Sequence, residues 1–281
     1  MKKDLFPFHL TPGGPRLTRA MLAQLPTELR EDPEAALLLM GCRMGENALG
    51  LAEYFAGRIV GIEEDSESIF YAKMAATEMG LSTRVSLQFM SPVATNFRPD
   101  QFNVIVLEGV FSSYAPGRVL KEAMRILPDG GWLLASDSCW LEAGVPTYIR
   151  DVWESPDHKI LTPPDVRTLV EERGCTVLQL QEESAALGPF YRQFQETVRG
   201  ITKNRFEGMK HQKALVKHYK HEIDVYHKNG GDRYMGYFSL VARKGDYAES
   251  TLPQPEEHHT AEIPLPAQPE SGEPRTGEAT D

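Results

Sequence analysis

The chain has 281 residues, of which 41% are hydrophobic, enough for one large or two small domains with a buried core. Its net charge of −10 lies mostly in residues 249–281, where eight acidic residues accompany one Arg, so the body lacks the basic character typical of nucleic-acid-binding domains. The three cysteines are odd in number and have no C-x-x-C spacing, which supports neither a disulfide framework nor a zinc site.

The N-terminal region gives no sign of membrane insertion or export. No run in the chain approaches the roughly 18 apolar residues of a membrane span, and residues 1–10 lack the long apolar stretch and cleavage site of a signal peptide. We therefore expect a cytoplasmic protein without a membrane partner. Residues 11–18 are rich in Pro and Gly and lead into helical spacing over 17–29, with Pro26 as a point of interruption. This segment is either a flexible connector or a loop that folds over a ligand.

Residues 37–64 predict a strand, a glycine turn, a helix and a second strand, and the rest of the chain is arranged around them. Gly41 and Gly45 follow a short apolar run, and the second strand ends in Glu63 and Glu64. Glycines let the backbone approach a ligand, a helix N-terminus offers unpaired N–H groups, and a carboxylate about twenty residues on accepts ribose hydroxyls. The segment therefore predicts a nucleoside cofactor, and the absence of G-x-G-x-x-G argues against a dinucleotide.

The turn in this unit resembles the first motif of the class I S-adenosylmethionine-dependent methyltransferases, a hydrophobic strand followed by an acid and G-C-G-x-G. Gly41, Cys42 and Gly45 match the motif. Leu39 stands where the family has its acid, and Arg43 where it has the middle glycine. Three orientations are open to the Arg43 side chain: outward, onto the carboxylate of the cofactor, or across the pocket.

Later segments resemble further parts of the same family, in the same order. Residues 102–107 form an apolar run that suits a central parallel strand and leads into Glu108. Glu122, Arg125 and the pair Gly130 and Gly131 fit the pattern E-x-x-R-x-L-x-x-G-G before an apolar strand. The resemblance implies an α/β fold with a Rossmann-like seven-stranded methyltransferase sheet, helices on both faces, and a helical insertion before an antiparallel last strand. It also implies S-adenosylmethionine as the cofactor.

Hydrophobic periodicity, and the residues that typically begin or end helices and strands, predict the remaining elements. Helices are expected over 66–79, 119–127 and 161–173, the last with Thr162 as its cap, and strands over 85–89, 132–135, 175–180 and 237–242. The predicted organisation is an N-terminal segment that caps the cofactor site (1–36), a cofactor-binding core (37–187), a helical insertion that covers the substrate (188–229), a final strand (230–245) and a disordered acidic, Pro-rich tail (246–281). The basic residues of the insertion are interpreted as a solvated face, and its histidines lack a metal-binding pattern.

The resemblance also implies a set of cofactor-binding residues, drawn from the turn and from the ends of the following strands. They are Met40, Gly41, Cys42, Gly45, Glu63, Glu64, Ser91 and Glu108. Ser91 and Pro92 occupy the places where the family has an acid that contacts the adenine, so the Ser91 hydroxyl or a backbone group is expected to substitute for that acid. Glu108 could contact the cofactor or a cation on the substrate.

Aromatic residues lie in the segments that line the acceptor pocket of similar methyltransferases, and they suit either a pocket wall or the core. They are Tyr114, Trp140, Tyr191 and Tyr234. No residue is identified as catalytic, and Asp137, at a strand end, suits a base or a structural hydrogen bond equally.

The predicted function is methyl transfer from S-adenosylmethionine to a small-molecule acceptor by in-line displacement, which needs mainly alignment and the exclusion of water. The acceptor cannot be identified from the sequence. The alternative is a degenerate methyltransferase fold that binds the cofactor, or acts as a scaffold, without catalysis. Leu39, Arg43 and Pro92 motivate this alternative.

Overall fold

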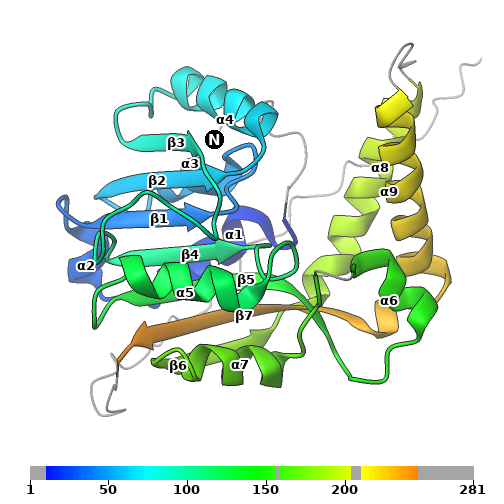
Figure 1. The fold of residues 1–281 in the computed structure, drawn as a ribbon. Coiled ribbons are helices and arrows are strands. Elements are labelled where there is room, and N and C mark those ends of the chain that lie inside the picture. Colours follow the sequence, from blue (N-terminus) through cyan, green and yellow to red (C-terminus); the bar gives the residue numbers. More distant parts are fainter. Residues whose placement is uncertain (1–10, 156–157, 204–209, 246–281) are drawn as a thin grey trace, which may run out of the picture. The chain divides into compact units, whose positions relative to one another are not determined.

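The computed structural model describes residues 11–155, 158–203 and 210–245 (Figure 1). All of them belong to one unit, Met1–Thr251. The tail that the sequence predicts to be disordered, residues 246–281, lies outside the described residues. Within the described part of the chain, no helix combines the length and the apolar character needed to cross a membrane.

Seven strands form a single sheet. In chain order they are β1 (Ala36–Met40), β2 (Arg58–Glu63), β3 (Val85–Phe89), β4 (Val104–Glu108), β5 (Trp132–Trp140), β6 (Cys175–Glu182) and β7 (Met235–Lys244). Their spatial order is β3-β2-β1-β4-β5-β7-β6, and β7 runs antiparallel to both of its neighbours while β1 to β5 are parallel. The predicted seven-stranded sheet with an antiparallel last strand is confirmed.

Helices cover both faces of this sheet, as predicted (Figure 1). They are α1 (Gly14–Leu22), α2 (Thr27–Glu31), α3 (Glu46–Leu51), α4 (Ser66–Glu78), α5 (Pro116–Ile126), α6 (Thr147–Trp153), α7 (Pro163–Glu171), α8 (Leu187–Lys203) and α9 (Lys210–Lys228), with two short 3-10 turns, η1 (Ser184–Ala186) and η2 (Gly231–Arg233). Buried residues of α1, α3 and α4 pack on one face, and those of α5 and α7 pack on the other.

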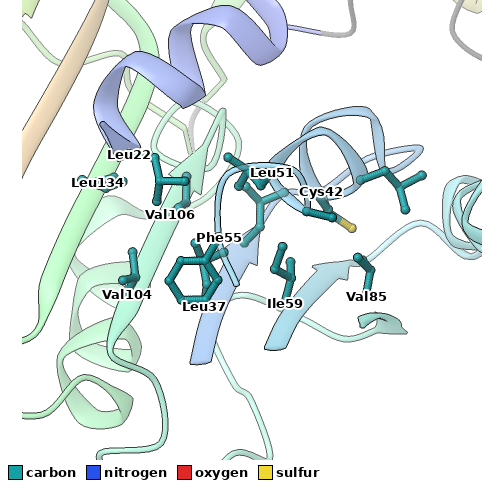
Figure 2. Close-up of a cluster of buried hydrophobic side chains, with 14 of the residues drawn as sticks. Leu22, Leu37, Cys42, Leu51, Phe55, Ile59, Val85, Val104, Val106 and Leu134 are labelled. Carbon is teal, nitrogen blue, oxygen red and sulfur yellow. The ribbon is translucent and has the colours of Figure 1, made fainter. Parts of the chain in front are cut away.

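Alternation along β1 divides its side chains between the two layers. Leu37 and Leu39 belong to the apolar cluster under α1, α3 and α4, and Leu38 and Met40 belong to the cluster under α5 and α7. Figure 2 shows the first of these clusters, with Leu37 among side chains from α1, α3 and the neighbouring strands. Leu39 is completely buried in this cluster, so the place of the family's acid is here part of the hydrophobic core.

Two helices are shorter than the sequence pattern predicts. The helical spacing over 17–29 forms two helices, α1 and α2, because Pro26 starts a new helix and has no N–H to continue the previous one. Helix α3 ends at Leu51 and leaves residues 52–57 outside any helix before β2, although the sequence around Leu49 to Ala56 has helical spacing that Gly57 was expected to end. The reason lies in the backbone beyond it, where Ala56 N–H donates to Arg30 O and Arg58 N–H donates to Ala35 O, so the chain turns back to begin β2.

The helical insertion lies between β6 and β7, as predicted, and consists of α8 and α9. Their buried residues join those of α6 and the end of β5 in a third apolar cluster, which includes Trp140, Ile149, Tyr191 and Tyr226. Helix α6 is absent from the sequence prediction. The predicted start of α7 is confirmed: the Thr162 side chain accepts from the Asp165 N–H, and the Asp165 carboxylate accepts from the Thr162 N–H.

Candidate functional site

A cleft opens at the carboxyl ends of β1, β2 and β4. The sheet order reverses at this edge, because the chain moves from β1 to β2 and β3 on one side and from β4 to β5 on the other. Such a switch point is where open α/β sheets bind ligands. The cleft has a volume of about 170 Å³, and its walls include Gly41, Arg43, Glu63, Gly109 and Tyr114.

The turn after β1 is held in an unusual backbone conformation. Gly41, Arg43 and Gly45 have φ values of 80°, 48° and 87°, so three of five consecutive residues are left-handed. The N–H groups of Gly41 and Cys42 both donate to Ile62 O at 3.0 Å, which ties the turn to the end of β2. The turn is therefore fixed by the neighbouring strand before any ligand binds.

Gly41 and Gly45 are required by close approach as well as by φ. A Cβ on Gly41 would collide with the carbonyl oxygen of Glu108 at the end of β4. A Cβ on Gly45 would lie 3.0 Å from the Cβ of Ala72 on α4. These two predicted site residues thus bring the ends of two strands and a helix together, and Gly41 also lines the cleft.

Glu63, the last residue of β2, faces the cleft with a partly exposed side chain. Its Oε2 accepts the Arg43 N–H at 3.0 Å, and its Oε1 accepts the Glu64 N–H at 2.8 Å. Each carboxylate oxygen has a second lone pair, so the group can still accept hydrogen bonds from a ligand. Two backbone donors therefore fix the orientation of this carboxylate.

Glu64 lies beside Glu63 but takes part in a different set of contacts. Its exposed carboxylate accepts the Ser91 hydroxyl at 3.0 Å. Burial, and then the nearby Glu64 carboxylate, raise the pKa of Tyr114. Ser91 precedes Pro92, and Pro92 and Tyr114 both line the cleft, so part of its wall is a proline and an aromatic ring.

Glu108 is buried rather than exposed on a loop. Its carboxylate accepts Thr18 Oγ1 from α1 at 2.5 Å and Asn47 Nδ2 from α3 at 2.6 Å, and Asn47 Nδ2 also donates to Thr11 Oγ1 at 3.2 Å. Burial raises the pKa of Glu108, and the hydrogen bonds from Asn47 and Thr18 and the charge of Arg43 oppose the rise. Glu108 borders the cleft, but its polar contacts are made with the helices that cover it.

Asp137, near the end of β5, is also buried and fully engaged. It accepts the N–H groups of Phe111, Ser112 and Ser138 and the hydroxyl of Ser112, at distances of 2.5 to 3.0 Å. Burial raises its pKa, and these hydrogen bonds oppose the rise. These contacts fix the loop that follows β4, which carries Gly109 and Tyr114 into the cleft wall.

Three of the four predicted acceptor-pocket aromatics lie around the helical insertion. Trp140 is buried, and its Nε1 donates to Glu154 Oε1 at 2.8 Å. The ring of Tyr191 stacks on Tyr226, with centroids 3.9 Å apart. Tyr234 packs against the same cluster at the start of β7. Only Tyr114 is among the residues that line the cleft.

The remaining predicted residues contribute through the backbone. Met40 and Cys42 are buried in the two opposite core clusters, and burial raises the pKa of the Cys42 thiol far above its usual range. Five lining residues were not among the predicted site residues: Arg43, Pro92, Gly109, Val110 and Ser113. A glycine directly after a predicted strand end is the signal that could have identified Gly109. Among the described residues, no cluster of His, Cys, Asp and Glu could hold a metal ion.

Known families and curated sequences both include matches to this chain. Residues 38–135 match the family model described as "Methyltransferase domain", which covers the chain from β1 into β5. A Haemophilus influenzae protein described as "Uncharacterized protein" is 26% identical over 132 residues, which is 46% of this chain. The chain spans about half the length of that curated relative, 51%.

Solved structures with the same fold cover most of the chain. The [4+2]-cyclase SpnF has a TM-score of 0.69 at 22% identity, covering 83% of this chain and 82% of the other. A putative sarcosine dimethylglycine methyltransferase from Galdieria sulphuraria has a TM-score of 0.68 at 18% identity, covering 82% and 86%. Phosphoethanolamine N-methyltransferase 2 from Haemonchus contortus, bound to phosphomonomethylethanolamine and S-adenosylhomocysteine, has 0.67 at 13%, covering 84% and 54%.

Proposed function

We propose that this chain, which has the class I methyltransferase fold and a methyltransferase domain at residues 38–135, transfers a methyl group from S-adenosylmethionine to a small-molecule acceptor. The observation that carries the proposal is the cleft at the strand-order reversal, where an oriented carboxylate, Glu63, faces a turn fixed in the left-handed conformation. This is the arrangement expected for a nucleoside held at the carboxyl edge of a parallel sheet.

The residues of the cleft fit the nucleoside part of this cofactor. Glu63 offers acceptor lone pairs to hydroxyl groups, Gly109 leaves its part of the wall without a side chain, and Pro92 and Tyr114 offer apolar surfaces for a base. One feature opposes the fit in the region next to them: the Arg43 guanidinium lies against Gly109, where a Cβ would be 2.6 Å from Arg43 Nη2. Binding therefore requires that this flexible side chain moves or becomes a ligand contact.

Bound S-adenosylmethionine supplies an electrophilic methyl group on a sulfonium, and the chain must align an acceptor with it and exclude water. Two buried acids at the carboxyl edge of the sheet are already engaged, Glu108 by Thr18 and Asn47 and Asp137 by the loop after β4. Both carboxylates are buried, and taking a proton from an acceptor would weaken these hydrogen bonds. This supports an acceptor such as an amine or a thiolate, which reacts without a protein base.

The similar structures support a small acceptor. Their descriptions name sarcosine and dimethylglycine, phosphomonomethylethanolamine, and geranyl diphosphate, the last for a C-methyltransferase from Streptomyces coelicolor. The presence of a [4+2]-cyclase among them supports a second candidate, a methyltransferase fold that does not transfer methyl groups. The observation in this chain that favours the second candidate is the position of the Arg43 side chain in the cleft.

Calorimetric titration with S-adenosylmethionine and S-adenosylhomocysteine tests the proposal. We expect both to bind, and Glu63→Ala to weaken binding by about 1 to 3 kcal/mol, the range for a lost hydrogen bond to a charged group. Glu67→Ala is the matched control, because Glu67 is an exposed acid in the first turn of α4 that does not line the cleft. No binding at millimolar ligand would reject the proposed function, and equal affinities of the two variants would remove Glu63 from the site.

A further inference from the structure

Arg43 is the one cation that lines the described cleft, and its position is unusual in two respects. Its φ of 48° places a long side chain where the left-handed backbone favours glycine. Its guanidinium then extends over Gly109, whose missing side chain leaves the space that Arg43 Nη2 and Cζ occupy. Arg43 therefore has a strained backbone conformation, and the glycine at position 109 leaves room for its guanidinium.

No acid of the described chain forms an ion pair with Arg43. Among the described residues, its guanidinium forms no hydrogen bond and no ion pair; only its backbone is engaged, with the N–H on Glu63. Both oxygens of Glu63 accept backbone N–H groups, and both oxygens of Glu108 accept side chains from α1 and α3. The cleft therefore contains a positive charge with no carboxylate of the described chain paired to it.

The charge of Arg43 acts on groups of both the core and the helical insertion. Burial raises the pKa of Glu108, of Tyr237 on β7 and of Tyr219 on α9, and in all three the charge of Arg43 opposes the rise. The guanidinium is thus close enough to act on the ends of β4 and β7 and on α9.

We propose that Arg43 binds an oxyanion of the ligand in this cleft, a carboxylate or a phosphate, through its guanidinium. The planar fork of donors suits both groups, and charged hydrogen bonds of this kind are stronger than neutral ones. The oxyanion has two sources, the methyl acceptor or the amino-acid end of the cofactor, and both present the same chemistry to Arg43. The identity of the cofactor in this inference rests on the proposed function. The observation that the Arg43 guanidinium has no ion-pair partner among the described residues does not depend on it.

The test compares Arg43→Gln, which keeps a long side chain without the charge, with Arg43→Lys, which keeps the charge. Arg58→Gln is the matched control, because Arg58 is exposed at the opposite end of β2. Each protein is titrated with S-adenosylhomocysteine and with methylthioadenosine, which lacks the amino-acid carboxylate. Each is then titrated with inorganic phosphate and with acetate, in the presence and absence of saturating S-adenosylhomocysteine.

A cofactor source predicts that Arg43→Gln loses about tenfold to hundredfold in affinity for S-adenosylhomocysteine and retains its affinity for methylthioadenosine. An acceptor source predicts unchanged affinity for both nucleosides and a loss of phosphate or acetate binding of about tenfold or more. In either case Arg43→Lys recovers part of the loss and Arg58→Gln behaves as the wild type.

Two results would overturn the inference. One is that Arg43→Gln matches Arg58→Gln with every probe. The other is that Arg43→Gln binds S-adenosylhomocysteine more tightly than the wild type, which would make the guanidinium an obstruction. If the wild type fails to bind S-adenosylhomocysteine, the proposed function fails, and the anion titrations on the ligand-free protein still decide the role of Arg43. Arg43-dependent anion binding then supports the inference, and its absence rejects it.

Discussion

Two strands flank β1 in the sheet, and each ends in a glutamate that borders the same cleft, Glu63 on β2 and Glu108 on β4. Glu63 is partly exposed and accepts the backbone N–H groups of Arg43, in the turn after β1, and of Glu64. Glu108 is buried and accepts side chains from α1 and α3. The difference comes from what covers each strand end, since α1 brings Thr18 onto β4 but brings no side chain onto Glu63.

This comparison separates two uses of an acid at a strand end. A carboxylate oriented by the backbone keeps lone pairs available and can serve a ligand, whereas a carboxylate held by side chains of two helices joins those helices to the sheet. Substitutions at the two ends should therefore differ in what they damage. We expect changes on the β4 side to lower the stability of the fold and changes on the β2 side to lower ligand affinity.

The largest effect is expected for Gly41→Ala, which disturbs both strand ends together. The left-handed φ costs about 1 to 2 kcal/mol for a residue with a Cβ, and the collision with the carbonyl of Glu108 adds to this cost, so we expect a total loss of about 3 kcal/mol or more. Gly80→Ala is the matched control, because Gly80 has φ 69° and nothing within 4 Å of an added Cβ. Urea unfolding measures both, and equal losses would show that the contact with β4 is unimportant.

Glu108→Ala is expected to cost about 2 to 3 kcal/mol of unfolding free energy. The substitution leaves the Thr18 hydroxyl and the Asn47 amide buried without their acceptor, and each buried unsatisfied group costs about 1 to 3 kcal/mol. Glu63→Ala, whose lost partners are backbone groups near solvent, should cost less than about 1 kcal/mol. The measurement is the denaturant midpoint at unchanged slope. A larger loss for Glu63→Ala would reverse the assignment of the two acids.

The strand ends, and with them the location of the cleft, follow from local sequence patterns. The strands are short apolar runs, and the turn glycines and the acids follow them within a few residues. Hydrophobic periodicity and turn-forming residues therefore predict them. The burial of Glu108 does not follow from such patterns. Its partners Thr18 and Asn47 are 90 and 61 residues away in the chain, and only the packing of α1 and α3 on the sheet brings them together.

The positions of the aromatic residues also depend on contacts between segments that are distant in the sequence. The sequence places Trp140 and Tyr191 in segments that suit either a pocket wall or the core. Their positions depend on α6, α8 and α9: Trp140 Nε1 bonds to Glu154 directly after α6, and Tyr191 stacks on Tyr226 of α9. Long-range pairing between helices cannot be read from the spacing within each helix. Tyr114 was easier to place, since it follows closely after the end of β4.

The pH dependence of stability, compared between the wild type and Glu108→Gln, further tests the difference between Glu63 and Glu108. Burial raises the pKa of Glu108, so the folded chain holds this proton at a pH where the unfolded carboxyl, with a pKa of about 4.3, has lost it. The contribution of Glu108 to stability is therefore greatest at low pH and falls as the pH rises toward the folded-state pKa. We expect wild type to lose stability relative to Glu108→Gln as the pH rises from 5, measured by urea unfolding. A gap between the two proteins that does not change with pH would contradict the role of burial.

The smallest effect is expected for Arg43→Gly, at the residue that joins the two strand ends. Its N–H donates to Glu63 and its guanidinium lies against Gly109, next to Glu108, and glycine keeps the first contact and removes the second. Relief of the left-handed φ should raise the unfolding free energy by up to about 1 kcal/mol. Arg58→Gly, in the extended backbone of β2, should lower it by about 0.5 to 1 kcal/mol. Equal losses in the two variants would mean that the packing of Arg43 on Gly109 stabilises the fold, and that the guanidinium holds the ends of β1 and β4 together even without a ligand.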